Sequence, residues 1–213
     1  IFKDYIDETP DLQVTAQQLN EEAFKRASVF NCCSGTMFHP TALETTRTAV
    51  EMAKRNGALI AIDANIRPLR WSSEKYCRET IASFFQDANI LKLTDEELFF
   101  LTEKNSIEEG LEVLKPLNVP IVLVTVGANG AYAVLNGEAM HVPVEQVVPV
   151  DTTGAGDAFM AGVLRYVHYN GLPTTKESLF DCVAFGNKLG AMAATKAGAL
   201  TALPRYDEVK DLL

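Results

Sequence analysis

Apolar and polar positions follow two patterns along the chain, one typical of strands and the other typical of helices. Short β-type runs predict strands at 28–33, 58–62, 90–93 and 120–126, and a further β-type run ends at Asp151. Apolar residues at helical spacing predict helices at 15–27, 41–56, 73–86, 95–102, 107–115, 155–169 and 179–196. Because strands and helices alternate in this way, the pattern indicates an α/β fold with a largely parallel sheet.

Two local signals refine this prediction. The dipeptide Asn136-Gly137 lies between β-type runs at 131–135 and 140–143, which predicts an inserted hairpin with a type I′ turn. Thr94 directly precedes the helix expected at 95–102 and is a candidate N-cap residue.

Length and composition are those of an ordinary globular chain. The 213 residues are 47% apolar and 22% charged, which is enough apolar material for a sizeable core. No repeat, low-complexity tract or linker-like stretch interrupts the pattern. We therefore expect residues 1–213 to form a single domain, or most of one.

The net charge of −9 makes binding to nucleic acid or to an anionic membrane surface unlikely to be the function, because an acidic surface repels phosphate groups. No apolar run approaches the roughly 18 to 20 residues that span a bilayer, and the chain does not open with a signal-peptide pattern. The four cysteines lack metal-type spacing, and the three histidines are scattered. These features favour a cytoplasmic protein with free thiols that acts on small molecules.

The segment with the most informative chemistry is 151–162, DTTGAGDAFMAG. Glycines at 154 and 156 let the backbone approach a ligand closely, and the unpaired N–H groups at the start of a helix favour a phosphate. Asp157 is unusual there, since a carboxylate repels phosphate. General-base catalysis would explain it, because Asp157 could take a proton from a hydroxyl that attacks the phosphate. Alternatively, Asp157 only complements the helix dipole and the glycines form an ordinary tight turn.

The longer string 151–164 resembles the second signature of the ribokinase-like sugar kinases, the phosphofructokinase-B family. Four further elements resemble this family in its own order: the DxNxRxxxW string at 62–71, an NxxE-like element at 92–97, a TxGxxG element at 124–131, and closing elements at 185–187 and 196–204. The resemblance implies a three-layer α/β/α fold and an ATP-dependent carbohydrate kinase that uses Mg²⁺.

The resemblance also implies roles for individual residues. Asp157 is expected to be the catalytic base and to meet the substrate, and the expected anion hole is formed by Gly154, Ala155 and Gly156. Glu97 is expected to organise Mg²⁺ through water. Nucleotide contacts are expected from Thr125, Gly127, Gly130, Asn187 and Thr94. Thr94 stands where the family usually has Asn, so a helix cap is its alternative role.

Other positions keep two interpretations. Arg67 is expected to face sugar or phosphate, or else to be a surface residue after a strand. Asp63 and Asn65 fit either phosphate or metal organisation or strand-end hydrogen bonding, and Trp71 fits packing better than sugar stacking. A monovalent cation such as K⁺ is expected at Asp151 and the carbonyls near Thr153 and Gly198. The alternative is that Asp151 only caps its turn.

Nothing in the chain resembles the family's first strands, its β lid or its Gly-Gly-Asn-type sugar segment. Residues Ile1–Tyr5 resemble the last lid strand, so we expect the chain to be the nucleotide-binding two-thirds of a kinase that dimerises through the absent lid. The string at 62–71 favours D-fructose, phosphorylated at the 6-hydroxyl. A 2-keto-3-deoxygluconate kinase, an aminoimidazole riboside kinase and a non-catalytic kinase-like module are the alternatives.

Overall fold

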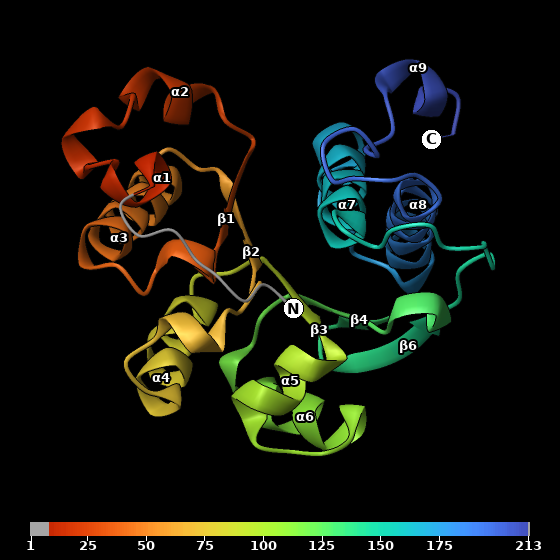
Figure 1. Ribbon diagram of the computed structural model, residues 1–213, viewed down its shortest axis with the longest axis horizontal. Helices are drawn as coiled ribbons and strands as arrows, with labels where there is room; N and C mark the ends of the chain where they lie inside the picture. The colour runs from red at the N-terminus through yellow and green to blue at the C-terminus, as the bar shows by residue number, and fades with distance from the viewer. Residues whose placement is uncertain (1–8, 213) are drawn as a thin grey trace. The chain divides into compact units, whose positions relative to one another are not determined.

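The computed structural model describes residues 9–212, so the strand predicted at Ile1–Tyr5 lies outside the described residues (Figure 1). The chain divides into two compact units, residues 1–91 and 92–213, and the division falls within strand β3. Each unit is described by itself below. The single-domain organisation expected from the sequence stays a prediction.

The first unit contains two parallel strands, β1 (Val29–Cys33) and β2 (Leu59–Asp63), in a register that pairs Val29 with Leu59. Its helices are α1 (Pro10–Gln13), α2 (Glu21–Arg26), α3 (Pro40–Arg55) and α4 (Glu74–Phe85), with 3₁₀ turns at Ala16–Gln18, Ser34–Thr36 and Pro68–Arg70. Helices α3 and α4 lie on the same side of the strand pair (Figure 1). Both strands and both long helices were predicted from the hydrophobic pattern.

The prediction of one helix over 15–27 is wrong. The segment forms a 3₁₀ turn, breaks at Leu19 and Asn20, and restarts as α2. The break occurs because Asn20 is an N-cap residue, whose Oδ1 accepts the Glu22 N–H at 3.0 Å. Phe24 is the buried residue of α2.

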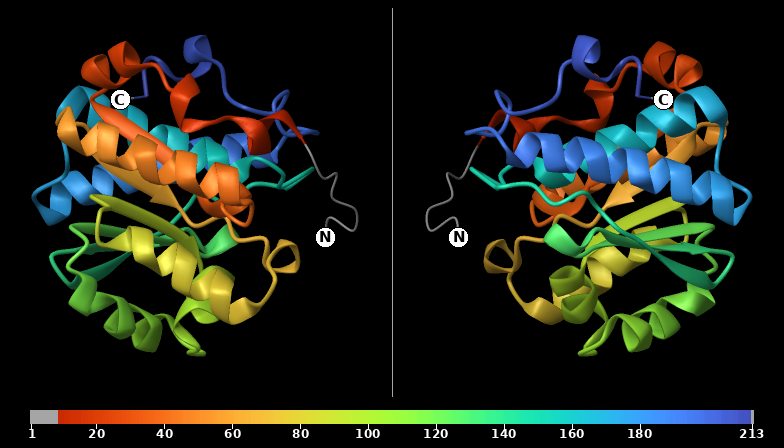
Figure 2. Two further views of the ribbon diagram at one scale, coloured as in Figure 1. Left: turned by 90° about the vertical axis from the view of Figure 1, so that its left-hand side faces the viewer. Right: turned by 90° about the vertical axis from the view of Figure 1, so that its right-hand side faces the viewer.

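The second unit contains the end of β3 (Ile90–Thr94) and strands β4 (Ile121–Thr125), β5 (Ala131–Leu135) and β6 (Glu138–Val142). Helices α5 (Asp95–Thr102) and α6 (Ile107–Leu114) lie on one side of these strands, and α7 (Ala155–Asn170) and α8 (Lys176–Ala194) lie on the other (Figure 2). The short helix α9 (Tyr206–Val209) and 3₁₀ turns at Lys115–Leu117 and Gly127–Asn129 complete the unit.

The predicted hairpin is confirmed, with β5 antiparallel to both β4 and β6. Asn136 and Gly137 both have positive φ, 52° and 83°, as a type I′ turn requires. The second strand begins at Glu138, two residues earlier than predicted, because the loop contains only those two residues.

The six strands follow chain order, β1 to β6, in a mostly parallel sheet. The second unit places helices on both faces of its strands, and the predicted α/β fold with three layers is confirmed. No helix among residues 9–212 is both long enough and apolar enough to cross a membrane.

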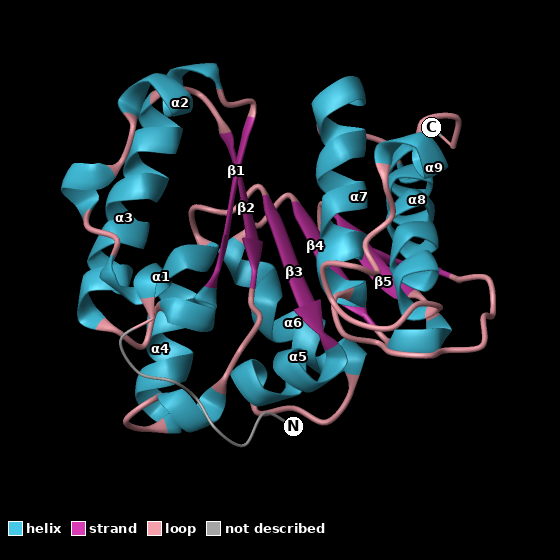
Figure 3. Ribbon diagram, turned by 45° about the horizontal axis from the view of Figure 1, so that its top comes forward, coloured by secondary structure: helices cyan, strands magenta, loops and turns pink. Residues whose placement is uncertain are grey.

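Helices α7 and α8 pack side by side at close range (Figure 3). A Cβ placed on Gly162 of α7 would lie only 2.9 Å from the Cα of Gly186 in α8, so the pair of glycines lets the two backbones approach. Helix α8 starts three residues before its predicted start at Leu179, since Thr175 caps it by accepting the Ser178 N–H at 3.1 Å.

The β-type run predicted to end at Asp151 is not a strand. Val148 and Val150 are 84% and 65% exposed, and the Val150 N–H donates to the carbonyl oxygen of Ala194 at 2.8 Å. This segment is therefore a loop tied to the end of α8, and it leads directly into α7.

Candidate active site

The start of α7 has the geometry of an anion-binding site. Gly154 occupies the N-cap position with φ +83°. The backbone of Ala199 lies close to it, since a Cβ added to Gly154 would be 3.4 Å from the Ala199 Cα. The Ala155 N–H donates to the Thr152 carbonyl oxygen at 3.1 Å. The amides of Gly156 and Asp157, in the first helical turn, have no partner within the helix. They are therefore oriented to bind an anion at the helix terminus.

Asp157 is the third residue of α7, and its side chain is exposed. The carboxylate is thus in the first turn of the helix whose N-terminus favours negative charge. An exposed carboxylate beside an anion site can reach a hydroxyl that approaches a bound phosphate. The role of catalytic base predicted for Asp157 stays a prediction.

Lys92 is a residue of this region that the sequence analysis did not select. It is 4% exposed within β3, and a Cβ added to Gly156 would lie 3.2 Å from the Lys92 Nζ. The amine therefore lies against the first turn of α7. The available signal in the sequence was a single lysine inside the apolar run at 90–93.

Thr94 and Glu97 form a reciprocal capping box at the start of α5. The Thr94 Oγ1 accepts the Glu97 N–H at 3.1 Å, and the Glu97 Oε2 accepts the Thr94 N–H at 2.8 Å. The cap predicted as the alternative role of Thr94 is therefore present. Both side chains are half-buried, and the nucleotide and Mg²⁺ roles predicted for them stay predictions.

The segment predicted to contact nucleotide is a tight connection between β4 and β5. The Thr125 hydroxyl donates to the Leu93 carbonyl oxygen at 3.3 Å, which places the ends of β3 and β4 next to each other. Gly127 and Gly130 both have positive φ. A Cβ on Gly130 would overlap the carbonyl oxygen of Val142, so only glycine allows this loop to pack on the end of β6.

Asn187 of α8 fastens the helix to the same end of β6. Its Nδ2 donates to the carbonyl oxygens of Val142 and Pro143 at 3.0 and 3.3 Å, and its side chain is buried. Asn187 also lines a cavity of about 330 Å³ whose wall includes Pro143, Val144, Ala191 and Met192. The lining is mostly apolar but also includes Glu145 and Lys188. An apolar cavity with a fixed amide suits a planar heterocyclic ring.

Asp151, Thr153 and Gly198 are brought together as the sequence predicted. The Asp151 carboxylate accepts the Thr153 N–H at 2.9 Å and the Gly198 N–H at 3.0 Å. Hydrogen bonds from the backbone and side chain of Thr153, and then from the Gly198 amide, lower the pKa of Asp151 below its usual value. The carboxylate therefore holds two loops together, in agreement with the capping alternative.

The predicted residues of the first unit follow β2. Asp63 is buried at the end of the strand, Asn65 has a φ of 39°, and the Arg67 Nη1 donates to the Ile66 carbonyl oxygen at 3.0 Å. Trp71 is 8% exposed and packs edge-on against Tyr76 with ring centroids 5.6 Å apart. This burial favours the packing interpretation of Trp71.

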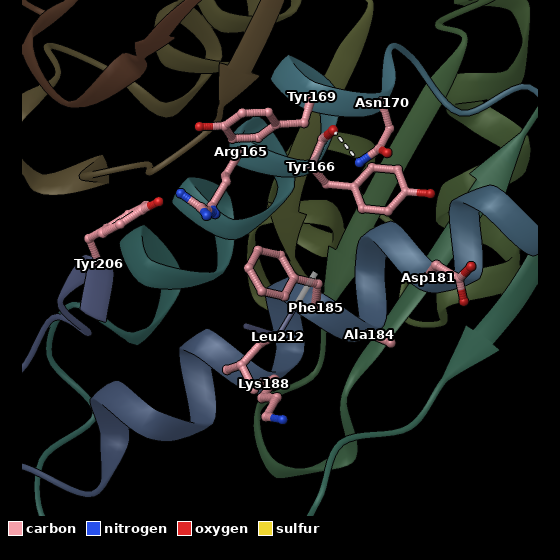
Figure 4. Close-up of a pocket in the computed structure, with 10 residues that line it drawn as sticks. All are labelled: Arg165, Tyr166, Tyr169, Asn170, Asp181, Ala184, Phe185, Lys188, Tyr206 and Leu212. Carbon is pink, nitrogen blue, oxygen red and sulfur yellow. Dashed lines mark hydrogen bonds between the residues drawn. The ribbon is translucent and has the colours of Figure 1, made fainter. Parts of the chain in front are cut away.

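A separate cavity of about 650 Å³ lies along the C-terminal half of α7 (Figure 4). Figure 4 shows the Arg165 side chain with Tyr169 and Tyr206, and its guanidinium lies 5.2 and 5.0 Å from their ring centroids. None of the predicted site residues lines this cavity. Since Arg165 and Asp157 are about 12 Å apart along the helix, the cavity is distinct from the anion site.

Within residues 9–212 no group of three or more His, Cys, Asp or Glu side chains is arranged to hold a metal ion.

Comparison with known proteins then decides the family. The model of the pfkB family carbohydrate kinases matches residues 5–205. The chain belongs to the pfkB family of carbohydrate kinases.

Named relatives of this pfkB chain include fructokinases. It is 35% identical over 217 residues to fructokinase-1 of Oryza sativa subsp. japonica. Among solved structures, fructokinase from Vibrio cholerae O395 with bound fructose, ADP and calcium matches with a TM-score of 0.87 at 32% identity, covering 93% of this chain. The aminoimidazole riboside kinase of Salmonella enterica, with aminoimidazole riboside and an ATP analogue, matches with a TM-score of 0.87 at 28% identity, covering 97%.

The pfkB chain spans only part of the length of these relatives. All of it aligns with 66% of the rice enzyme, and the structural matches cover 64% of the Vibrio cholerae chain and 68% of the Salmonella chain. The family is therefore established, while the activity and the acceptor belong to the proposal that follows.

Proposed function

We propose that this protein is an ATP-dependent carbohydrate kinase that phosphorylates D-fructose. The observation that carries the proposal is the start of α7, where the exposed Asp157 carboxylate lies in the same turn as the amides of Gly156 and Asp157. Phosphoryl transfer needs both features: donors for the transferring group and a base for the attacking hydroxyl. This helix start differs from a capped one in that its N-cap, Gly154, has no side chain to accept a hydrogen bond from these amides.

In the proposed reaction Asp157 accepts the proton of the sugar hydroxyl as its oxygen bonds to the terminal phosphorus of ATP. The bond from that phosphorus to the bridging oxygen breaks, and ADP leaves with the electron pair. The Gly156 amide and the positive end of α7 stabilise the negative charge on the transferring group. Gly154 and Ala155 complete the predicted anion hole, although the Ala155 N–H already donates to Thr152.

The nucleotide is proposed to lie along the loop that joins β6 to α7. Its base fits the cavity beside Asn187, and its phosphates reach the start of α7 at the other end of the same loop. Thr125, Gly127 and Gly130 lie at the end of β4 and pack on the wall of residues 142–143. These residues are proposed to shape the nucleotide site rather than to take part in the chemistry.

Glu97 is the proposed residue for Mg²⁺, which when bound would neutralise phosphate charge. The carboxylate fits this ion, because Mg²⁺ prefers oxygen ligands and keeps several waters. A contact through water leaves the Thr94–Glu97 capping box intact. The loops that Asp151 holds together also present backbone carbonyls near Thr153 and Gly198, which suits a monovalent cation.

The acceptor is tested with a panel of D-fructose, aminoimidazole riboside, 2-keto-3-deoxygluconate and ribose. The protein is prepared both as residues 1–213 and as the complete product of its reading frame, and ADP release is followed for each compound. We expect the highest kcat/KM with fructose in the complete product, and a 6-phosphate by NMR of the product. Arg67, expected to face the acceptor, is tested as Arg67→Gln, which should raise the KM for fructose more than that for ATP.

A higher kcat/KM for aminoimidazole riboside would replace fructose with the second acceptor, which the structural similarity to the Salmonella kinase favours. ATP binding without transfer to any compound would support a non-catalytic module instead. The Asp157→Asn variant is the control that separates enzyme-catalysed ADP release from contaminating ATPase activity.

A further inference from the structure

Lys92 is a buried charged residue in the middle of β3, for which the family motifs described above give no role. Among the residues that the structure describes, it is the only lysine or arginine in the buried class, with 4% exposure. A lysine is seldom buried to this extent, so the location of its amine decides what it can contact.

The strand geometry directs Lys92 toward the α7 start. Side chains two residues apart in a strand point to the same face, so Lys92 and Thr94 share a face of β3. The α7 backbone lies on that side, because a Cβ on Gly156 would be 3.2 Å from the Lys92 Nζ. The amine is thus placed below the first helical turn, next to the residue whose amide belongs to the proposed anion hole.

Two positive features therefore converge at one point. The ammonium of Lys92 is one, and the partial positive charge at the N-terminus of α7 is the other. Lys92 also interacts with other groups of the protein, and the argument needs only the location of its amine. An anion bound at the start of α7 would therefore be within reach of both.

We propose that Lys92 is a further catalytic residue that contacts the transferring phosphate from the side of the sheet. This inference rests on the proposed kinase function and deepens it. The ammonium stabilises negative charge on the phosphate oxygens while the α7 amides bind the same group from the helix side.

Gly156 has a defined part in this arrangement. A methyl group at this position would press on the Lys92 amine, since 3.2 Å is closer than an ordinary contact. The two residues are therefore expected to be coupled, and a substitution at one should alter the effect of a substitution at the other.

The first test uses Lys92→Met in the complete product of the reading frame. We expect kcat to fall by about 10²–10³-fold, as when a charge-stabilising donor is removed. Titration calorimetry should show the affinity for ATP falling at least about tenfold, because a hydrogen bond to a charged group is lost. The affinity for adenosine should stay unchanged. Lys115→Met, an exposed lysine of the same unit, is the matched control.

A structural role for Lys92 would lower ATP and adenosine affinity together, or lower the thermal unfolding temperature, and either result overturns the proposal. Wild-type kcat in Lys92→Met, with Asp157→Asn inactive, also overturns it while leaving the kinase function in place. If no acceptor is phosphorylated by the wild type, the kinase function fails, and the comparison of ATP with adenosine still tests Lys92.

The second test is a double-mutant cycle with Gly156→Ala, which needs no removal of the buried charge. Gly156→Ala alone should weaken ATP binding and leave adenosine binding unchanged. In the Lys92→Met background the same substitution should cost less, because the amine it displaces is gone. Equal losses in the two backgrounds would show that Gly156 and Lys92 act independently and would contradict the proposed contact.

Discussion

Helices α5 and α7 of the second unit both have an acidic residue in the first turn. They differ in whether a side chain satisfies the backbone amides of that turn. At α5 the N-cap is Thr94 and the third residue is Glu97, and these two side chains satisfy each other's backbone amides. At α7 the N-cap is Gly154, which has no side chain to cap the helix, and the third residue is the exposed Asp157. The same helix position thus holds an acid in both cases.

The difference separates a helix start that serves the fold from one that serves a ligand. The capping box of α5 uses its donors internally, so its stability depends on the two side chains. The first turn of α7 leaves donors for an external anion, and α8 supports it instead, because Gly190 approaches the Ala155 carbonyl oxygen closely. Substitutions at the start of α7 are therefore expected to change mainly activity, and substitutions in the α5 capping box are expected to change mainly stability.

The largest effect is expected from neutralising the two acids. Asp157→Asn should lower kcat by about 10²–10⁴-fold, the usual contribution of a general base, and ATP should still bind. Its unfolding free energy should change by less than about 0.5 kcal/mol, because the side chain is exposed. The measurements are steady-state kinetics, calorimetry and urea unfolding.

Glu97→Gln is the counterpart at α5, and it should mainly raise the Mg²⁺ concentration needed for half-maximal rate. Turnover of Asp157→Asn within a few-fold of wild type would remove Asp157 from the role of base. An unaltered Mg²⁺ titration for Glu97→Gln would leave that residue with its capping role alone, and Glu96 would become the candidate.

The second prediction concerns the N-cap glycine. Gly154→Ala should destabilise the protein by about 1–2 kcal/mol, the cost of a side chain at a left-handed position, and should also weaken ATP binding. Gly57→Ala is the matched control, since Gly57 has a φ of +78° and no atoms near its absent Cβ. It should lose stability without loss of ATP affinity. Equal ATP affinity in both variants would show that Gly154 serves the turn only.

Much of this contrast could be predicted from the sequence. The apolar run at 120–126 predicted β4, the Asn-Gly dipeptide predicted the β5–β6 turn, and Thr94 was identified as a cap from its place before a helical pattern. The Gly154–Asp157 string fitted either an anion site or an ordinary tight turn, and the resemblance of the longer string to the sugar kinases favoured the anion site. Each of these features depends on residues that are close together in the sequence, so the sequence alone could indicate it.

The remaining features depend on contacts between distant segments. The valines at 147–150 have the apolar character of a strand, yet they lie exposed because their loop is hydrogen-bonded to the end of α8 instead of joining the sheet. Lys92 is only a lysine in an apolar strand until the fold places Gly156 beside its amine. No periodicity reports which helix lies over which strand end, so neither feature could be found from the sequence.

The third prediction tests the closed helix start. Thr94→Ala removes the acceptor of the Glu97 N–H and should cost about 0.5–2 kcal/mol in unfolding free energy, whereas Thr94→Ser should restore most of it. Thr175→Ala removes the corresponding acceptor at α8 and is the control. If Thr94 only caps α5, both alanine variants lose stability and keep their KM for ATP. A rise in that KM confined to Thr94→Ala would support the predicted nucleotide contact.

The smallest effect is expected from Asp151, which holds the open helix start in place through the loop before it. Its pKa is lowered in the folded protein, first by the Thr153 hydrogen bonds and then by the Gly198 amide. A carboxyl group with a lowered pKa stabilises the fold above its unfolded value of about 3.9, and this contribution is lost as the pH falls through the lower folded value.

Below about pH 4 the Gly198 amide should therefore exchange faster with solvent than its intrinsic pH dependence predicts, and the loop should loosen before the protein unfolds. Asp151→Asn should remove this pH dependence. Glu208→Gln is the control, because Glu208 also has a lowered pKa, caused mainly by the Arg205 amide and Lys196, but it does not bond to Gly198. If the Gly198 amide of the wild type exchanged below pH 4 no faster than its intrinsic pH dependence predicts, the role of Asp151 would be contradicted. The ordered start of α7 would then depend on α8 alone.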